Sequence, residues 1–208
     1  MKKARKLTAV LLSLVMLLAL VVPASAADTY SITIHNDKTG HTYEAYQIFA
    51  GTVSSDEETN GETGGPMLGD ITWGSGVDGA ALLAALKAAD EEKYGACTTA
   101  ADVAEALGTE TATAADAAAF ADIAAQHLTA TVAGTATAPN DGGNYIIEGL
   151  PAGYYLVKDS LQEDDNQTGQ VLSDYIVQVL GNVTMEPKDS GIPVSYTHLR
   201  AHETSQDL

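Results

Sequence analysis

The chain has 208 residues, 45% of them hydrophobic, which is enough for one sizeable core or two small ones. It carries 28 acidic residues against 10 basic ones, and this formal net charge of -18 argues against nucleic acid as a partner. Cys97 is the one cysteine, so folds held together by disulfides within the chain are excluded.

The chain begins like a secretory signal peptide. A basic start, "MKKARK", leads into an apolar run from Leu7 to Val22 and then into the small residues "ASA". A membrane-spanning helix is the competing interpretation, but the apolar run is short for a bilayer core and ends at Pro23. We therefore expect residues 1–26 to be removed by cleavage between Ala26 and Ala27, and the mature protein to be exported.

Two β-rich runs follow within residues 30–53, "YSITIHNDKTGHTYEAYQIFAGTV". Alternation at Tyr30, Ile32 and Ile34 predicts a strand, and the turn residues 36–40 predict either a hairpin or two adjoining strands. Residues 54–69 are acidic and rich in Gly, Ser and Thr, which favours a solvated loop.

A helical segment occupies residues 77–128. "VDGAALLAALKAADEEKY" places leucines at helical spacing, "TTAADVAEALG" opens with Thr99 and Asp102 as a capping box, and "TATAADAAAFADIAAQHL" repeats this device with Thr113 and Asp116. Three short alanine-rich helices are expected. Small side chains supply little apolar area, so these helices should lie against a larger sheet.

Strands return at Tyr145. "NYIIEGLPAGYYLVKDS" gives two apolar runs separated by residues 149–153, and "SDYIVQVLGNVTM" predicts one long final strand, apolar on both faces. Strands at both ends of the chain with helices between them indicate an α+β protein, a β-sandwich that carries a helical insertion.

Evidence for catalysis or metal binding is weak in this sequence. It has no Gly-x-Ser-x-Gly or His-Glu-x-x-His motif, so we expect neither an enzyme nor a cofactor. His35, His41 and His127 lack metal-ligand spacing and are expected to be surface or strand residues. Cys97 has no histidine near it in sequence and is expected to be a small packed residue near a helix start.

Four segments together resemble a known family. "WGSGVDGAALLAAL", "TTAADVAEALG", "GLPAGYYLVKDS" and "YIVQVLGNVTMEPK" are similar to the N-terminal domain of Gram-positive sortase-assembled pilin subunits, the isopeptide-forming fimbrial proteins. The resemblance covers residues 28–193. It implies an Ig-like β-sandwich domain over residues 27–190, in a secreted, wall-attached fimbrial subunit that supports cell adhesion and has sortase and other pilin subunits as partners.

The resemblance also implies roles for individual residues. In the family, a Pro-Lys at the end of the first domain supplies the amine that attacks the acyl-sortase thioester, and Pro187-Lys188 stands at that place. Many family domains also form an internal isopeptide bond between a first-strand Lys and a last-strand Asn, beside a buried acid. Asn182 matches the asparagine and Asp159 matches the acid. The first strand, "YSITIHND", has no lysine, and Lys38 comes later, so no internal bond is expected.

An alternative is a secreted or wall-anchored adhesin module that binds a host ligand or glycan and is not polymerised. Five aromatic residues could provide its contacts: Tyr43, Tyr46, Trp73, Tyr154 and Tyr155. Aromatic residues in strands are more often part of the core.

Residues 191–208 are expected to be a linker followed by a non-native tail. "VSYTHLRAHETSQDL" resembles translated sequencing-adapter read-through and is excluded from the fold. The genuine protein would then continue into further sandwich domains and a sorting signal of the Leu-Pro-x-Thr-Gly type.

Overall fold

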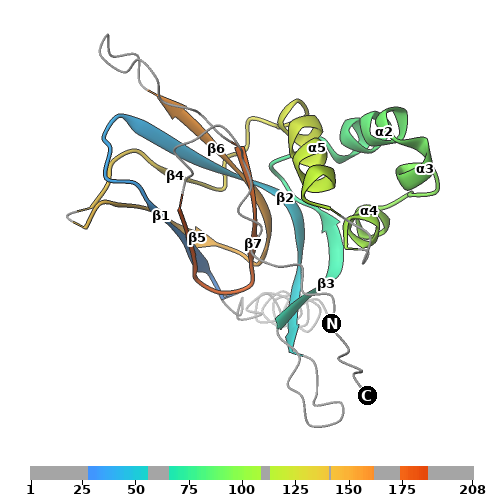
Figure 1. Ribbon diagram of the computed structural model, residues 1–208. Coiled ribbons are helices and arrows are strands. Elements are labelled where there is room, and N and C mark those ends of the chain that lie inside the picture. Colours follow the sequence, from blue (N-terminus) through green and yellow to red (C-terminus); the bar gives the residue numbers. More distant parts are fainter. Residues whose placement is uncertain (1–27, 56–65, 109–112, 141, 162–173, 187–208) are drawn as a thin grey trace, which may run out of the picture.

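The computed structural model of the chain describes residues 28–55, 66–108, 113–140, 142–161 and 174–186 (Figure 1). Strands outnumber helices in these residues, so the predicted α+β composition is confirmed. The strands are β1 (Tyr30–His35), β2 (His41–Ser55), β3 (Pro66–Trp73), β4 (Gly134–Ala136), β5 (Asn144–Leu150), β6 (Gly153–Leu161), β7 (Asp174–Val179) and β8 (Val183–Met185). The helices are α2 (Gly79–Ala89), α3 (Glu91–Tyr94), α4 (Ala100–Leu107) and α5 (Ala114–Ala125).

The strands form two sheets, here named sheet A and sheet B. Sheet A has the order β5-β1-β8, in which β1 is antiparallel to β5 and parallel to β8. Sheet B has the order β3-β2-β6-β7, and β4 also pairs with β2. The long pairing of β2 with β6 runs from His41 opposite Leu161 to Ala50 opposite Gly153 and forms the centre of sheet B.

The connection between β1 and β2 differs from a hairpin. The two strands lie in different sheets, and in the described part of the chain they do not pair with each other. Each strand has one apolar face, with Ile32 and Ile34 on β1 and Tyr43 and Ala45 on β2. Placing these faces opposite each other across a core buries both, which edge-to-edge pairing within one sheet would not do. The adjoining-strand interpretation is therefore the correct one.

Sheet B has a core on each of its faces. The inter-sheet core lies between sheets A and B and includes Ile32, Ile147 and Tyr155, whereas the helical core lies between sheet B and the helices and includes Leu82, Leu86 and Leu156. Figure 1 shows the helices on one side of β2 and β6, with β1 and β5 on the other. The helices therefore cover a sheet face, as their small side chains predict.

The strand β6 shows why both cores depend on sheet B. Tyr155, Leu156 and Val157 are consecutive residues with no solvent exposure. Side chains alternate along a strand, so Tyr155 and Val157 enter the inter-sheet core while Leu156 enters the helical core. A substitution in either core therefore acts on the same central strand.

The helical segment begins its helices as the sequence predicts. Thr99 with Asp102 and Thr113 with Asp116 both form reciprocal capping boxes. The expectation of one helix across residues 77–94 is wrong, because Asp90 is extended and its side chain accepts a hydrogen bond from the Lys93 backbone N–H, which ends α2 and starts α3. The described residues thus contain four helices in place of three.

The prediction of one final strand over residues 173–185 is also wrong. The strand β7 belongs to sheet B and ends at Val179, while β8 belongs to sheet A and begins at Val183. Changing sheets lets Val179 and Met185 both contribute to the inter-sheet core. The run that is apolar on both faces is explained by Ile176, which packs on the helical core from the other side of β7.

The predicted loop over residues 54–69 is partly strand. The strand β2 continues to Ser55, and β3 begins at Pro66 and pairs with it, with Val53 opposite Leu68. Residues 56–65 lie outside the described part of the chain. At the other end of β3, an added Cβ on Gly79 would meet the Trp73 ring at 2.2 Å, so α2 begins where only glycine allows the ring to approach the backbone.

Candidate functional site

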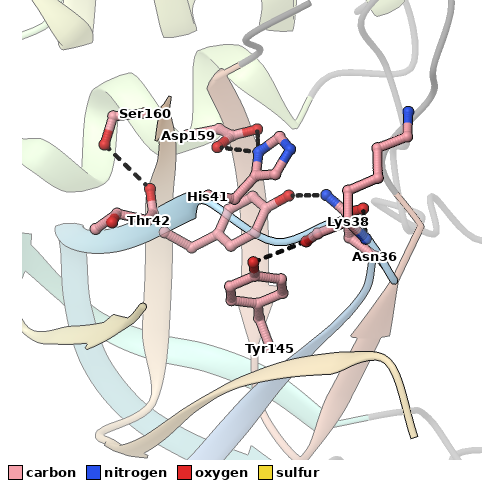
Figure 2. Close-up of polar contacts among 8 residues, drawn as sticks. Asn36, Lys38, His41, Thr42, Tyr145, Asp159 and Ser160 are labelled. Carbon is pink, nitrogen blue, oxygen red and sulfur yellow. Dashed lines mark hydrogen bonds and ion pairs between the residues drawn. The ribbon is translucent and has the colours of Figure 1, made fainter. Parts of the chain in front are cut away.

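A buried histidine and aspartate form the most distinctive polar contact of the described residues. His41, the first residue of β2, places its Nδ1 2.9 Å and 3.0 Å from the two carboxylate oxygens of Asp159 on β6 (Figure 2). The residues are only 4% and 5% exposed, respectively. Both side chains project from sheet B toward sheet A, because Asp159 follows Tyr155 and Val157 along β6 at the two-residue period of a strand.

Two tyrosines and the connection between β1 and β2 enclose this pair. The Tyr43 ring stacks on the His41 ring at 5.7 Å between centroids, and the Tyr145 ring meets Tyr43 edge-on at 5.0 Å. The Asn36 side-chain amide donates to the Tyr43 hydroxyl at 2.8 Å, and the Tyr145 hydroxyl donates to the Lys38 carbonyl at 2.8 Å. The cluster thus joins both sheets to residues 36–38 (Figure 2).

Burial sets the electrostatics of the cluster. It raises the pKa of the Asp159 carboxyl above its ordinary value, and the hydrogen bond with His41 opposes that shift. Burial also raises the pKa of Tyr43, so this phenol stays neutral. The His41 Nε2 is buried with no hydrogen-bond partner among the described residues. The His41–Asp159 contact is therefore a polar contact in surroundings that water reaches poorly.

The His41–Asp159 pair does not form a serine triad with its sequence neighbour. The Ser160 hydroxyl donates to the Thr42 carbonyl at 3.2 Å, on the side of sheet B away from the pair (Figure 2). A nucleophile must lie within hydrogen-bond reach of the imidazole for that chemistry. The geometry fits a structural polar contact that joins the ends of β2 and β6.

The three residues named as candidates for an internal isopeptide bond are not brought together. Asp159 is buried against His41, while Lys38 is exposed and its side chain runs away from Asp159 in Figure 2. Asn182 is exposed and accepts hydrogen bonds from the Ser31 backbone N–H and hydroxyl, at the start of β1. From Ser31 to His35 the strand covers about 13 Å, so Asn182, beside Ser31, and Lys38, which follows His35, lie near opposite ends of β1.

The described chain leaves sheet A at one defined point. Pairing with β1 ends at Met185 opposite Ile34, and the Glu186 carboxylate that follows lies 3.8 Å from the His35 Nδ1. Pro187 and the crosslinking candidate Lys188 lie outside the described residues. The predicted cleavage residues Ala26 and Ala27 also lie outside them.

The aromatic residues named for the adhesin alternative are packing residues. Tyr43 and Tyr155 are fully buried, and Tyr46, Trp73 and Tyr154 are half-buried against the helical core. Phe49 contacts both Trp73, at 5.3 Å between ring centroids, and Tyr154, at 6.0 Å. None of the five is presented to solvent as an open binding platform.

Cys97 and the remaining histidines have ordinary settings. Cys97 is 5% exposed in the helical core just before α4, as expected for a packed residue, and burial raises the pKa of its thiol. His35 is an exposed strand residue and His127 is half-buried. In the described ranges, no group of three or more His, Cys, Asp or Glu residues could hold a metal ion.

None of the helices described here is long and apolar enough to cross a membrane.

His41 is a strand residue, one of the two settings expected for it, but it is buried and paired with Asp159. The alternation of residues along β2 indicates that His41 is buried, because His41 precedes Tyr43 and Ala45 by two and four residues on the apolar face of the strand. What the sequence did not contain was the register that places Asp159 diagonally across from it.

No family model, curated protein or solved structure matches this chain.

Proposed function

We propose that this chain is a structural subunit of a cell-surface pilus, exported and covalently polymerised by sortase through Lys188, and that it supports adhesion. Its partners would be sortase and other pilin subunits, and the role would be structural and not catalytic. The proposal begins from the four pilin-like segments of the sequence. Three further points support it.

The four segments pack together in the fold. Leu82 of α2, Val103 of α4 and Leu156 of β6 are members of the helical core, and Ile176 of β7 packs against it. The strands β6 and β7 are also neighbours in sheet B. The resemblance therefore falls on one contiguous part of the molecule, as expected if the segments come from a common ancestral domain.

The arrangement of the sheets is compatible with an Ig-like sandwich, the finer architecture that we propose. Sheets A and B face each other across one core, and the first and last described strands, β1 and β8, are parallel neighbours. The strand β8 is an edge strand of sheet A, so the described chain ends at the edge of a sheet.

The observation that carries the proposal is the exit of the chain at Glu186. Regular pairing ends at Met185, two residues before Pro187, and proline cannot donate a backbone hydrogen bond to a further ladder. Lys188 is the second residue after Glu186 in the sequence, so the proposed reaction would take place just after the last described strand. In the proposed step the neutral amine of Lys188 attacks the acyl-sortase thioester carbonyl, an isopeptide bond forms, and the sortase thiol leaves.

The acidic surroundings of Lys188 place a demand on the enzyme. Glu186 and Asp189 flank the residue in sequence, and nearby carboxylates favour the protonated amine. A lysine with an ordinary pKa of about 10.4 is already mostly protonated at neutral pH. Sortase would therefore have to remove the proton as the bond forms.

The experiment replaces Lys188 in the full-length gene. Lys188→Arg should abolish or sharply reduce high-mass ladders in wall extracts and leave export of the monomer unchanged, because arginine keeps the charge and lacks the amine chemistry. Lys38→Arg and Lys158→Arg are matched controls that should leave the ladders intact. Normal polymerisation of Lys188→Arg would reject the crosslinking role.

The internal bond is tested separately by intact mass. We expect residues 27–193 to have the mass of their sequence, because Lys38, Asp159 and Asn182 are kept apart. A deficit of about 17 Da, one ammonia lost in a Lys–Asn bond, would contradict this expectation, and a deficit of about 18 Da would indicate a bond to an acid.

A further inference from the structure

The first and last described strands meet in a geometry that responds to tension. The strands β1 and β8 are parallel, with Ile32 opposite Val183 and Ile34 opposite Met185. The chain enters this pair at Tyr30 and leaves it toward Glu186. Because parallel strands run in the same direction, the entry and the exit lie at opposite ends of the pair.

This placement decides how a pulling force acts on the pair. Tension between Asp28 and Glu186 draws β1 and β8 in opposite directions along their length, so that all their hydrogen bonds are loaded together. Tension between two neighbouring strand ends would instead open the bonds one after another. Tyr30 of β1 and Leu150 of β5 are such neighbouring ends, because β1 and β5 are antiparallel.

Side chains reinforce the β1–β8 pair. The Asn182 Oδ1 accepts hydrogen bonds from the Ser31 backbone N–H at 3.1 Å and from the Ser31 hydroxyl at 3.3 Å, where the chain crosses from sheet B to sheet A. Ile32 and Ile34 are fully buried and Met185 is 6% exposed, so sliding of the strands would bring apolar surface into water.

We propose that the β1–β8 pair is a mechanical clamp, which resists tension that arrives through the chain after Glu186 while the body of the domain is held. This goes beyond the proposed function. In a polymer linked through Lys188, a load that passes from Lys188 into the following chain does not cross β1 and β8. The β1–β8 pair bears load when a partner holds the domain itself. The proposed clamp and the proposed crosslink can therefore be rejected independently of each other.

The test is single-molecule force spectroscopy of residues 27–208, pulled in two geometries in a Cys97→Ala background. One geometry has handles at the two chain ends, and the other has handles at the N-terminus and at Glu148→Cys, an exposed position on β5. We expect the end-to-end unfolding force to be about twofold higher or more, because the pair is sheared in one geometry and β1 is peeled from β5 in the other. Equal forces would overturn the proposal.

Substitution of Asn182 separates the clamp from general stability. Asn182→Ala should speed end-to-end unfolding at constant force about fivefold, since two hydrogen bonds across the loaded pair are lost. The matched control is Asn140→Ala, which loses two hydrogen bonds of 3.0 Å, to Gly142 and Asn144, away from β8. Asn182→Asp keeps an accepting oxygen and should retain the wild-type rate. An Asn182→Ala effect no larger than that of Asn140→Ala would also overturn the clamp.

Discussion

The two faces of sheet B are covered by different kinds of residue. The inter-sheet core is filled by large strand residues, four of them tyrosines, and encloses the His41–Asp159 pair. The helical core combines leucines and phenylalanines with alanines on short helices whose ends are fixed by capping boxes. The starts of α4 and α5 on the helical side are therefore specified by local sequence, whereas the inter-sheet side depends on residues far apart in the chain.

The largest effects are expected from cavities in the two cores. Leu86→Ala on the helical side and Ile147→Ala on the inter-sheet side each remove a fully buried side chain and should lower the free energy of unfolding by about 2–5 kcal/mol. Because Tyr155 and Leu156 of β6 serve different cores, both variants should unfold in one transition. Trp73 fluorescence and far-UV circular dichroism in urea check this, and separate midpoints would show that the two layers are independent.

The next largest effect is expected at the buried pair. Asp159→Ala leaves the His41 ring without its acceptor and should cost about 1–3 kcal/mol, whereas Asp159→Asn keeps an oxygen that can accept from Nδ1 and should cost less. Asp122→Ala, at an exposed position of α5, is the control and should change stability by less than about 0.5 kcal/mol. Urea titration gives the three values. If all three variants lower the free energy of unfolding by the same small amount, the His41–Asp159 pair contributes nothing to stability.

The same carboxyl predicts a dependence on pH. Burial raises the pKa of Asp159, so the folded state holds this proton more tightly than the unfolded state does. The contribution of Asp159 to stability is therefore present below its unfolded pKa and is lost as pH rises through the folded value. The difference in unfolding free energy between wild type and Asp159→Asn should fall as the pH rises above about pH 4, the ordinary pKa of an unfolded aspartate. A difference that increases as the pH rises would contradict this prediction.

The smallest effects are expected at the helix caps. Thr99→Ala and Thr113→Ala each remove the side-chain acceptor at the start of a helix and should cost about 1 kcal/mol. Serine at either position keeps the acceptor and should restore most of the stability. Thr135→Ala, on the exposed side of β4, serves as the control. Thermal unfolding measures these changes in stability. If Thr99→Ala and Thr113→Ala destabilise the protein no more than Thr135→Ala does, the capping boxes do not distinguish the helical side of sheet B from the other side.

The sequence predicted what is local and missed what depends on distant pairing. Thr99, Asp102, Thr113 and Asp116 give the helix starts because a capping box lies within four residues. The break between β7 and β8 was missed because apolar residues on both sides of Gly181 look like one strand until the two sheets are placed. Short strands such as β4, three residues long, have too few alternations to stand out.

The candidate site divides in the same way. The family resemblance singled out Asp159 as the match to a buried acid, but its partner His41 is separated from it by 118 residues. Only the register between β2 and β6 brings them together. Asn182 was named for the last strand and lies instead in the crossover before β8, bonded to Ser31.

The most direct measurement for the proposed pilus is peptide mass spectrometry of high-mass ladders purified from the cell wall. We expect a branched peptide in which the side-chain nitrogen of Lys188 is acylated by the threonine carboxyl end of a neighbouring subunit. Ladders in which Lys188 is unmodified and another lysine carries the branch would contradict it, as would wall material that contains the chain only as a monomer.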